Sequence, residues 1–489
     1  SCVTVDTLQA PLLVTGRTSV TDTMALNRTL STLLRQASCQ RMTGTSVCLV
    51  RSIITFKQPL RPKMMPEVME ALKSYVGYVH DVTAAHAKLP KSQDELPVRS
   101  MEDSYDECII PLGSSLAMKK THTSGQGFVR FGRILEDMDE FAVWLSYRYV
   151  QYPGLSFGVP MPVNMVTALV DSIRSDDMDI RPQHDLKLCG HISWVGRTSM
   201  EVTMELQVLV PEQARNLLTA KFVMVAMEAN ATKTVPVNKL VPKNEEEQAI
   251  FNEGAASVAR RKKSEASGIL KQPPTQEERD LLHKLFLEDF DPETYILKSG
   301  ECPVGAIWMQ DARLTNVIIC QPESENLYNK VFGGFLMRNA FELAWATTFI
   351  LCKRRPKTYH TDDIWFRKPV ELGSLLHYES QVVYTQDNFV QVNVNATVIK
   401  PDKGTKEITN VFHFTFSLDG ENPAPRVIPR SYPESMLYIE GKRYLDHAMS
   451  KRKPAASNGH SHGKIHSTSQ GAAHESKTSS HHESKTKGE

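Results

Sequence analysis

The feature that most constrains the fold of this chain is an internal duplication with a long period. Residues 190–204 (GHISWVGRTSMEVTM) and residues 380–394 (SQVVYTQDNFVQVNV) share a pattern of alternating apolar and polar side chains, about 190 residues apart. Repeats of about 20 to 50 residues build solenoids, and this period is far longer. The duplication therefore predicts two similar globular halves.

Each half is predicted to contain one helix followed by strands. In the first half, the helix is expected at residues 162–173 (PVNMVTALVDSI) and the strands at 185–195, 200–210 and 218–227. In the second half, the helix is expected at residues 334–352 and the strands at 363–370, 375–384, 389–399 and 410–418. The second helix is apolar on almost every side, so other structure must enclose it. The pattern predicts an α+β fold with one central helix per half.

Composition excludes several classes of protein. A chain of 489 residues is too long for one ordinary core. Its net charge of +1 provides no overall attraction to nucleic acids or anionic membranes. No apolar run reaches the roughly 18 residues of a membrane-spanning helix. The eight cysteines form no CxxC pair, which predicts free thiols, a reducing compartment and no metal site.

Both ends of the chain are predicted to lie outside the folded core. The first 60 residues contain a stretch, from residue 23 to residue 66, that has no acidic side chain but several arginines. This composition is typical of a mitochondrial transit peptide, with Met24 as the expected initiator. The tail after Arg452 has almost no apolar residue and should be disordered. Its histidines, among them His460 and His462, would bind a metal only weakly.

Composition shifts divide the rest of the chain. We expect a helical segment at residues 61–125, the first domain at 126–242, a charged linker at 243–295, the second domain at 296–425 and a C-terminal segment at 426–489. The linker is predicted to form two surface helices around a basic, mobile loop at residues 260–267. This loop could contact a phosphate, but a solvated surface is the simpler interpretation.

Several sequence motifs resemble one known family. These motifs are FGRILED (131–137), GHISWVGRTSMEV (190–202), VFGGFLM (331–337), ELAWAT (342–347), KPVELGSL (368–375) and NVFHFTF (410–416). From about residue 60 to about residue 445, the chain resembles the mitochondrial acyl-coenzyme A thioesterases with two hotdog domains. The resemblance implies a tandem hotdog fold, in which an antiparallel sheet wraps each central helix. It also implies hydrolysis of acyl-coenzyme A in the mitochondrial matrix, with no cofactor, by a trimer or dimer of such chains.

The resemblance also implies a composite active site. In this family, an Asn lies seven residues before a Gly-Gly pair that opens one central helix, and an acid lies about two turns into the helix of the other domain. The pair is Gly333 and Gly334, and the matching Asn is Asn326. Aligning the two predicted helices places Asp171 at the acid position.

The second copy of this site is predicted to be degraded. Phe341 stands where an acid would be needed, and Ser156 replaces the Asn. The Gly-Gly pair is replaced by Val163 and Asn164 in the same alignment. The sequence therefore predicts one complete site per chain.

These residue types suit thioester hydrolysis. A carboxylate such as Asp171 can take the proton of the attacking water or attack the carbonyl itself. Free N–H groups at a helix N-terminus, reached past Gly333 and Gly334, can hold the developing oxyanion. The amide of Asn326 can orient the water or the thioester. Glu342 is the alternative acid, and Asp171 could instead be an ordinary paired or solvent-facing carboxylate.

The phosphates of coenzyme A need cations and N–H donors. The resemblance places Arg197, Thr198 and Ser199 near the nucleotide, with Arg367 and Lys368 as the counterpart region of the second half. The alternative interpretation of both groups is surface charge at strand ends.

Two rival functions remain open at this point. One is a protein that binds acyl-coenzyme A without cleaving it, as a sensor or carrier. The other is a hotdog hydratase, which would carry an Asp and a His early in its central helix, and neither predicted helix contains His. We also expect the two halves to pair edge to edge into one continuous sheet, because unpaired sheet edges favour aggregation.

Overall fold

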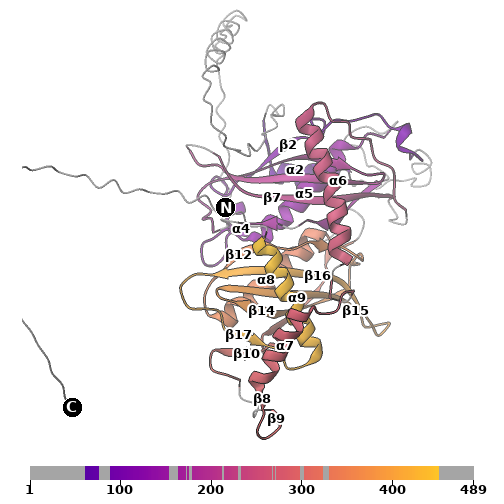
Figure 1. Ribbon diagram of the computed structural model, residues 1–489. Coiled ribbons are helices and arrows are strands. Elements are labelled where there is room, and N and C mark those ends of the chain that lie inside the picture. Colours follow the sequence, from indigo (N-terminus) through magenta and orange to yellow (C-terminus); the bar gives the residue numbers. More distant parts are fainter. Residues whose placement is uncertain are drawn as a thin grey trace, which may run out of the picture. The chain divides into compact units, whose positions relative to one another are not determined.

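The computed structural model describes residues 61–75, 89–152, 163–171, 173–175, 179–211, 214–228, 233–266, 268–269, 271–297, 302–322 and 330–450. The predicted transit peptide, Ser156, Asn326 and the His-rich tail lie outside these residues. Within the described part, two antiparallel-rich sheets each accompany one long helix (Figure 1). The α+β prediction is confirmed.

The first half is organised around α5 (Phe131–Tyr149). Its sheet has the order β1-β2-β5-β6-β7-β3-β13. These strands are β1 (Lys63–Met64), β2 (Asp106–Ile110), β3 (Val163–Val170), β5 (Leu186–Val195), β6 (Ser199–Val208), β7 (Arg215–Glu228) and β13 (Ile364–Trp365). The helix buries a broad apolar face that includes Ile134, Phe141 and Leu145. Burial of this face against the sheet stabilises the first half.

The prediction of a helix at residues 162–173 is wrong. This segment forms strand β3, which pairs antiparallel with β7, with Val166 opposite Val225. Both faces of β3 are covered, so its apolar run lacks the alternation that marks a half-exposed strand. The β-branched residues Val163, Val166 and Thr167 favour the extended form. The long helix of this half is α5, about 30 residues earlier. Its acidic residues interrupt the apolar pattern in the sequence, although the helix has an apolar face.

The second half agrees with its predictions. Helix α8 (Gly333–Cys352) begins within one residue of the expected position. Its sheet has the order β11-β14-β15-β16-β12-β4. These strands are β4 (Ile173–Arg174), β11 (Arg313–Ile319), β12 (Pro356–Thr361), β14 (Leu375–Gln386), β15 (Phe389–Lys400) and β16 (Thr405–Leu418). The strand expected at residues 363–370 is reduced to the short β13.

The two halves exchange short strands. Strand β13 of the second half pairs with β3, placing Ile364 opposite Val170. Strand β4 of the first half pairs with β12, placing Ile173 opposite Thr361. The two halves thus pair strands within the chain, but the prediction of one continuous sheet is wrong, because two separate sheets exchange only short strands.

The remaining elements cover these sheets or connect them. The segment predicted as helical, residues 61–125, contains α2 (Met65–Tyr75), η1 (Gln93–Glu95) and α4 (Leu116–His122), but it also supplies β1 and β2 to the first sheet. The linker forms α6 (Glu245–Ala266) and α7 (Gln276–Asp289), followed by the hairpin of β8 (Phe290–Asp291) and β9 (Ile296–Leu297). Strand β10 (Ala306–Trp308) pairs with β17 (Arg426–Ile428). The short helix η2 (Met309–Asp311) lies between β10 and β11, and α9 (Tyr432–Ser450) follows β17. None of the helices among the described residues is long and apolar enough to cross a bilayer.

The predicted basic loop at residues 260–267 is mostly helical. Helix α6 continues through Ala266 and lies across the first sheet (Figure 1). Arg261 is buried there, and its guanidinium lies 3.0 Å from a carboxylate oxygen of the fully buried Glu201 on β6. A buried charge must be paired, so this contact holds the last turns of α6 against the sheet.

We predict that Arg261→Ala lowers the free energy of unfolding by about 3 kcal/mol, because Glu201 would lose a buried cation. Lys221, at 3.4 Å from Glu201, would compensate in part. Denaturant unfolding measures the effect. The matched control is Arg260→Ala at the exposed neighbouring position. Equal losses for both variants would contradict the buried pair as the cause.

Candidate active site

Helices α5 and α8 cross in close contact at a glycine of each. A methyl group on Gly334 would lie 2.8 Å from Cα of Glu136, and one on Gly132 would lie 3.2 to 3.4 Å from Arg338. Each glycine therefore contacts the residue four positions beyond the other glycine, which is the relation expected of an antiparallel pair. An ion pair of 3.0 Å between Glu136 and Arg338 spans the same crossing. Only glycine permits two helix backbones to approach this closely.

This crossing brings Asp139 of α5 to the N-terminus of α8. The backbone N–H of Gly334 donates a hydrogen bond of 2.6 Å to Oδ2 of Asp139. The hydroxyl of Thr167, from β3, donates a bond of 2.6 Å to Oδ1. Both donors come from other elements, and both carboxylate oxygens are thereby oriented. A carboxylate at this position is also favoured by the positive end of the helix dipole.

The surroundings of Asp139 shift its pKa. Its side chain is fully buried, and this burial raises its pKa to about 7. The hydrogen bonds from Thr167 and Gly334 act in the opposite direction, because they favour the charged form. A carboxyl group that titrates near neutral pH can accept a proton from a weak acid such as water.

The equivalent position on the other helix holds an aromatic ring. Asp139 follows Gly132 by seven residues, as Phe341 follows Gly334. The ring of Phe341 packs edge-on against that of Phe131, with centroids 5.0 Å apart, at the start of α5. A phenyl ring can neither accept a proton nor orient water. Phe341 thus stands where Asp139 stands on the other helix, and the loss of a second site stays a prediction.

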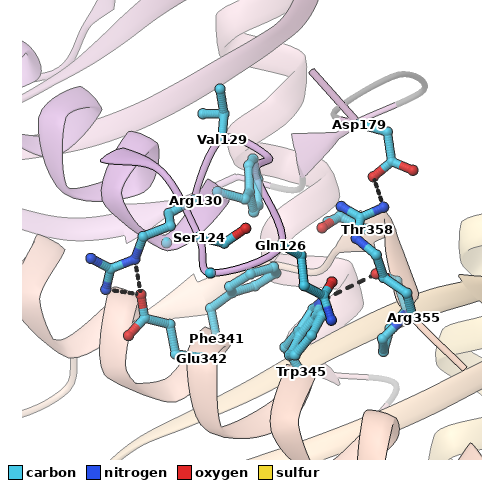
Figure 2. A pocket seen from close by; sticks show the side chains of 14 residues that line it. Ser124, Gln126, Val129, Arg130, Asp179, Phe341, Glu342, Trp345, Arg355 and Thr358 are labelled. Atoms are coloured by element: carbon cyan, nitrogen blue, oxygen red, sulfur yellow. Dashed lines mark hydrogen bonds and ion pairs between the residues drawn. The ribbon is translucent and has the colours of Figure 1, made fainter. Parts of the chain in front are cut away.

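A cavity of about 270 Å³ lies at this acid-free position (Figure 2). Phe341, Glu342 and Trp345 of α8 line one side, and the start of α5 lines another. Glu342, the alternative acid in the sequence, receives a hydrogen bond of 3.0 Å from Nε of Arg130. This ion pair occupies the Glu342 carboxylate. The cavity therefore does not reproduce the environment of Asp139.

The structure does not place Asp171 in a helix. It follows β3, is partly buried, and has an oxygen 3.7 Å from the guanidinium of Arg261. The alignment that assigned Asp171 to the acid position assumed a helix where β3 lies, so that alignment is wrong. Val163 and Asn164, which were aligned with the Gly-Gly pair, likewise lie in β3. Gly333 and Gly334 begin α8 as predicted, whereas Asn326 lies outside the described residues.

The predicted coenzyme A contacts fall in two loops. Arg197 and Thr198 form the turn before β6, and Ser199 begins that strand. Ser199 of β6 pairs with Val225 of β7, and Val225 pairs with Val166 of β3. The turn before β6 therefore lies two strands away from β3, the strand that carries Thr167.

Arg367 and Lys368 follow Phe366 in the second loop. The Phe366 ring lies 3.4 Å from the position of a methyl group on Gly333, so this loop runs beside the start of α8. Arg367 and Lys368 are both exposed, and Lys368 forms an ion pair with Glu407.

Sequence reasoning missed Asp139 and Thr167. A usable signal was present, since RFG at residues 130–132 parallels FGG at residues 332–334. Aligning Gly132 with Gly334 would have selected Asp139 directly. Thr167 gave no such signal, because its contact with Asp139 joins residues 28 positions apart.

Comparison with known proteins shows the family of this chain. The chain is 42% identical over 374 residues to acyl-coenzyme A thioesterase 9, mitochondrial, of Mus musculus, which covers 76% of this chain and 84% of the relative. The chain belongs to the acyl-coenzyme A thioesterase 9 family.

More distant relatives carry similar names. Acyl-coenzyme A thioesterase 2, chloroplastic, of Humulus lupulus is 28% identical, over 71% of this chain and 82% of the relative. A solved acyl-CoA hydrolase from Staphylococcus aureus is 21% identical, covers 30% of this chain and 91% of its own, and has a TM-score of 0.29, too low to carry an argument about fold. A scan against models of protein families found no match. The predictions of the family and of a thioesterase enzyme are confirmed.

We predict that Gly334→Ala lowers the free energy of unfolding by about 1–3 kcal/mol, because the new methyl group would overlap Cα of Glu136. Thermal and denaturant unfolding measure this loss. Gly125→Ala is the control, since a methyl group there meets nothing within 4 Å. Unchanged stability of Gly334→Ala would contradict the tight crossing of α5 and α8.

Proposed function

We propose that this chain hydrolyses acyl-coenzyme A thioesters at the junction of α5 and α8, with Asp139 as the general base. The observation that carries the proposal is the buried Asp139 carboxylate, held by the N–H of Gly334 and titrating near neutral pH. Family membership supports the reaction class, since the relatives are named acyl-coenzyme A thioesterases.

In the proposed reaction, Asp139 takes a proton from water as the water oxygen attacks the thioester carbonyl carbon. Negative charge then develops on the carbonyl oxygen, which is proposed to be stabilised by N–H groups of the first turn of α8 other than that of Gly334, since Asp139 holds that one. The tetrahedral intermediate collapses by breaking the carbon–sulfur bond. The departing thiolate regains a proton, giving a free carboxylic acid and coenzyme A. Asn326 is proposed to orient the water or the carbonyl, seven residues before Gly333.

We also propose that each half is a hotdog domain. One long helix beside a mainly antiparallel sheet, present in both halves, supports this assignment. Arg197, Thr198, Ser199, Arg367 and Lys368 are proposed to contact coenzyme A. The loop that carries Arg367 and Lys368 has the better support, because it follows Phe366, whose ring lies beside Gly333.

One complete site per chain follows from the difference between Asp139 and Phe341. The equivalent position at Phe341 lacks a base, so we propose that no thioester is hydrolysed there. A sensor that only binds acyl-coenzyme A is the second candidate. The buried ionisable Asp139 speaks against it, because burying an acid is costly and binding an acyl chain does not need one.

Substituting each carboxylate in turn tests whether Asp139 or Asp171 is the base. We predict that Asp139→Asn lowers kcat/KM at least about 100-fold, because general-base assistance is lost. Asp171→Asn should lower it less than about tenfold, since Asp171 is placed beside Arg261 and after β3. Release of free thiol from acyl-coenzyme A substrates of increasing chain length measures both, with circular dichroism to check folding.

Three outcomes decide between the candidates. A large loss for Asp139→Asn alone supports the proposal. A large loss for Asp171→Asn alone would return the role to the residue that the sequence suggested. Binding of acyl-coenzyme A by the unaltered chain without any thiol release would favour the sensor.

The pH dependence of kcat/KM should follow the ionisation of Asp139. General-base catalysis needs the ionised carboxylate, so kcat/KM should fall as the pH drops below about 7. Thr167→Val removes a hydrogen bond that favours this ionised form, which raises the pKa further. The acidic limb should therefore move to higher pH.

Thr203→Val is the control for this shift, because Thr203 donates its hydrogen bond to Ser193 within the first sheet. An acidic limb that does not move in Thr167→Val would show that another group controls it.

Location and assembly remain proposals of the same kind. The relatives of Mus musculus and Homo sapiens are named mitochondrial, and we propose the mitochondrial matrix as the site of action. We propose that the chains associate as trimers, with dimers as the alternative. The exposed Val317 and Ile319 on β11, the outer strand of the second sheet, support association. Light scattering of the purified chain would measure its mass.

A further inference from the structure

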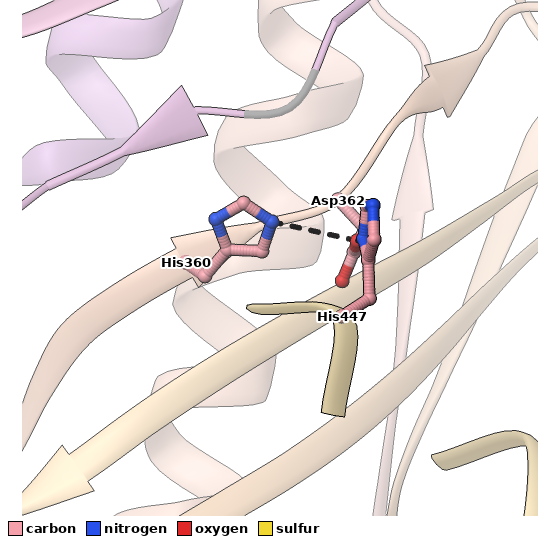
Figure 3. A group of neighbouring side chains, drawn as sticks. All are labelled: His360, Asp362 and His447. Carbon is pink, nitrogen blue, oxygen red and sulfur yellow. Dashed lines mark hydrogen bonds and ion pairs between the residues drawn. The ribbon is translucent and has the colours of Figure 1, made fainter. Parts of the chain in front are cut away.

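Three side chains with metal-ligating atoms converge beside the second sheet, away from Asp139. His360 lies near the end of β12, Asp362 follows that strand, and His447 projects from α9 (Figure 3). One ligand atom from each residue lies within 4.8 Å of the other two. The residues come from segments about 85 positions apart, so the fold itself assembles the group.

Asp362 is a buried acid whose ion-pair partners in the described part of the chain are histidines. Its side chain is only 3% exposed, and within the described part of the chain no Lys or Arg forms an ion pair with it. Its two ion-pair partners there are His360 and His447. Oδ2 of Asp362 has no hydrogen-bond partner among the described residues. A buried carboxylate without compensation is costly, so a positive charge is expected at this position.

His360 is similarly incomplete. Its side chain is 1% exposed, yet neither ring nitrogen has a hydrogen-bond partner in the described part of the chain. Buried polar atoms in folded proteins nearly always have hydrogen-bond partners, and a bound ion can take the place of such a partner. Imidazole nitrogen and carboxylate oxygen are both common ligands of zinc.

The separations between the ligand atoms are long for charge-assisted hydrogen bonds, although His447 and Asp362 are within hydrogen-bonding distance. Oδ1 of Asp362 lies 3.5 Å from Nε2 of His360 and 3.3 Å from Nδ1 of His447. Charge-assisted hydrogen bonds are shorter, about 2.7–2.9 Å. Ligands at about 2.0–2.1 Å from a tetrahedral zinc ion lie roughly 3.3–3.4 Å from one another. These two separations are close to the edges of a tetrahedral site, and the third, between the two histidines, is at most 4.8 Å.

We propose that His360, Asp362 and His447 bind a divalent transition-metal ion of the zinc type. His447 is about half exposed, so the ion can enter from solvent at this side and keep a water as its fourth ligand. The backbone N–H of Asp362 donates a hydrogen bond of 3.1 Å to the carbonyl of His413, whose ring stacks on Tyr444 of α9 at 3.9 Å. The ion fastens α9 to the end of β12, where β12 pairs with β4 of the first half.

The test uses the full chain with its six tail histidines changed to glutamine, so that only the folded part can bind. These are His460, His462, His466, His474, His481 and His482. After equilibrium dialysis against zinc, elemental analysis should find one ion per chain. Co²⁺ should give the strong visible absorption of tetrahedral coordination. His447→Ala, at a half-exposed position that does not support the core, should weaken binding at least about tenfold.

His283→Ala on α7 is the matched control, since His283 is also exposed but far from this group in sequence. It should bind zinc as the parent does. The proposal is overturned if the parent binds no zinc, if His447→Ala binds as tightly as the parent, or if the cobalt spectrum is octahedral. The first of these outcomes would leave a simple histidine–aspartate ion pair in its place.

Discussion

The close contact between α5 and α8 at Gly132 and Gly334 is the constraint on which the rest of the structure depends. Because neither glycine has a side chain, the backbone of each helix reaches the other within van der Waals distance. This approach carries Asp139 to the first turn of α8, where an N–H of the helix end binds it. The same contact holds the two halves together, so the site exists only when both halves are folded.

The duplicated architecture creates two equivalent positions, and one pair of residues makes them different. Asp139 and Phe341 occupy corresponding places on α5 and α8, and each faces the start of the other helix. Burying an acid costs stability, while burying a phenyl ring contributes to it. A chain that needs only one reacting group per pair therefore loses nothing by replacing the second acid with an aromatic residue.

Much of the remaining structure positions or encloses this pair. Strand β3 supplies Thr167, and its partner β13 leads to Phe366 beside Gly333. Helix α6 is held to the first sheet by Arg261, whose guanidinium lies near both Glu201 and Asp171. Asp171 thus has a structural partner in the place where sequence alignment had suggested a catalytic base. Short strands exchanged between the halves protect sheet edges that would otherwise be open.

The sequence by itself determined the duplication, the α+β class, the position of α8 and most of the long strands, because these depend on local periodicity. It also identified the Gly333–Gly334 pair and the loss of the acid at Phe341, because these depend on a motif. Only the tertiary structure decided between helix and strand for residues 163–170, since a strand covered on both faces has no alternation to reveal it. Only the fold could join Asp139 to Thr167 and Gly334 and bury it between them, because those contacts arise from segments far apart in the chain.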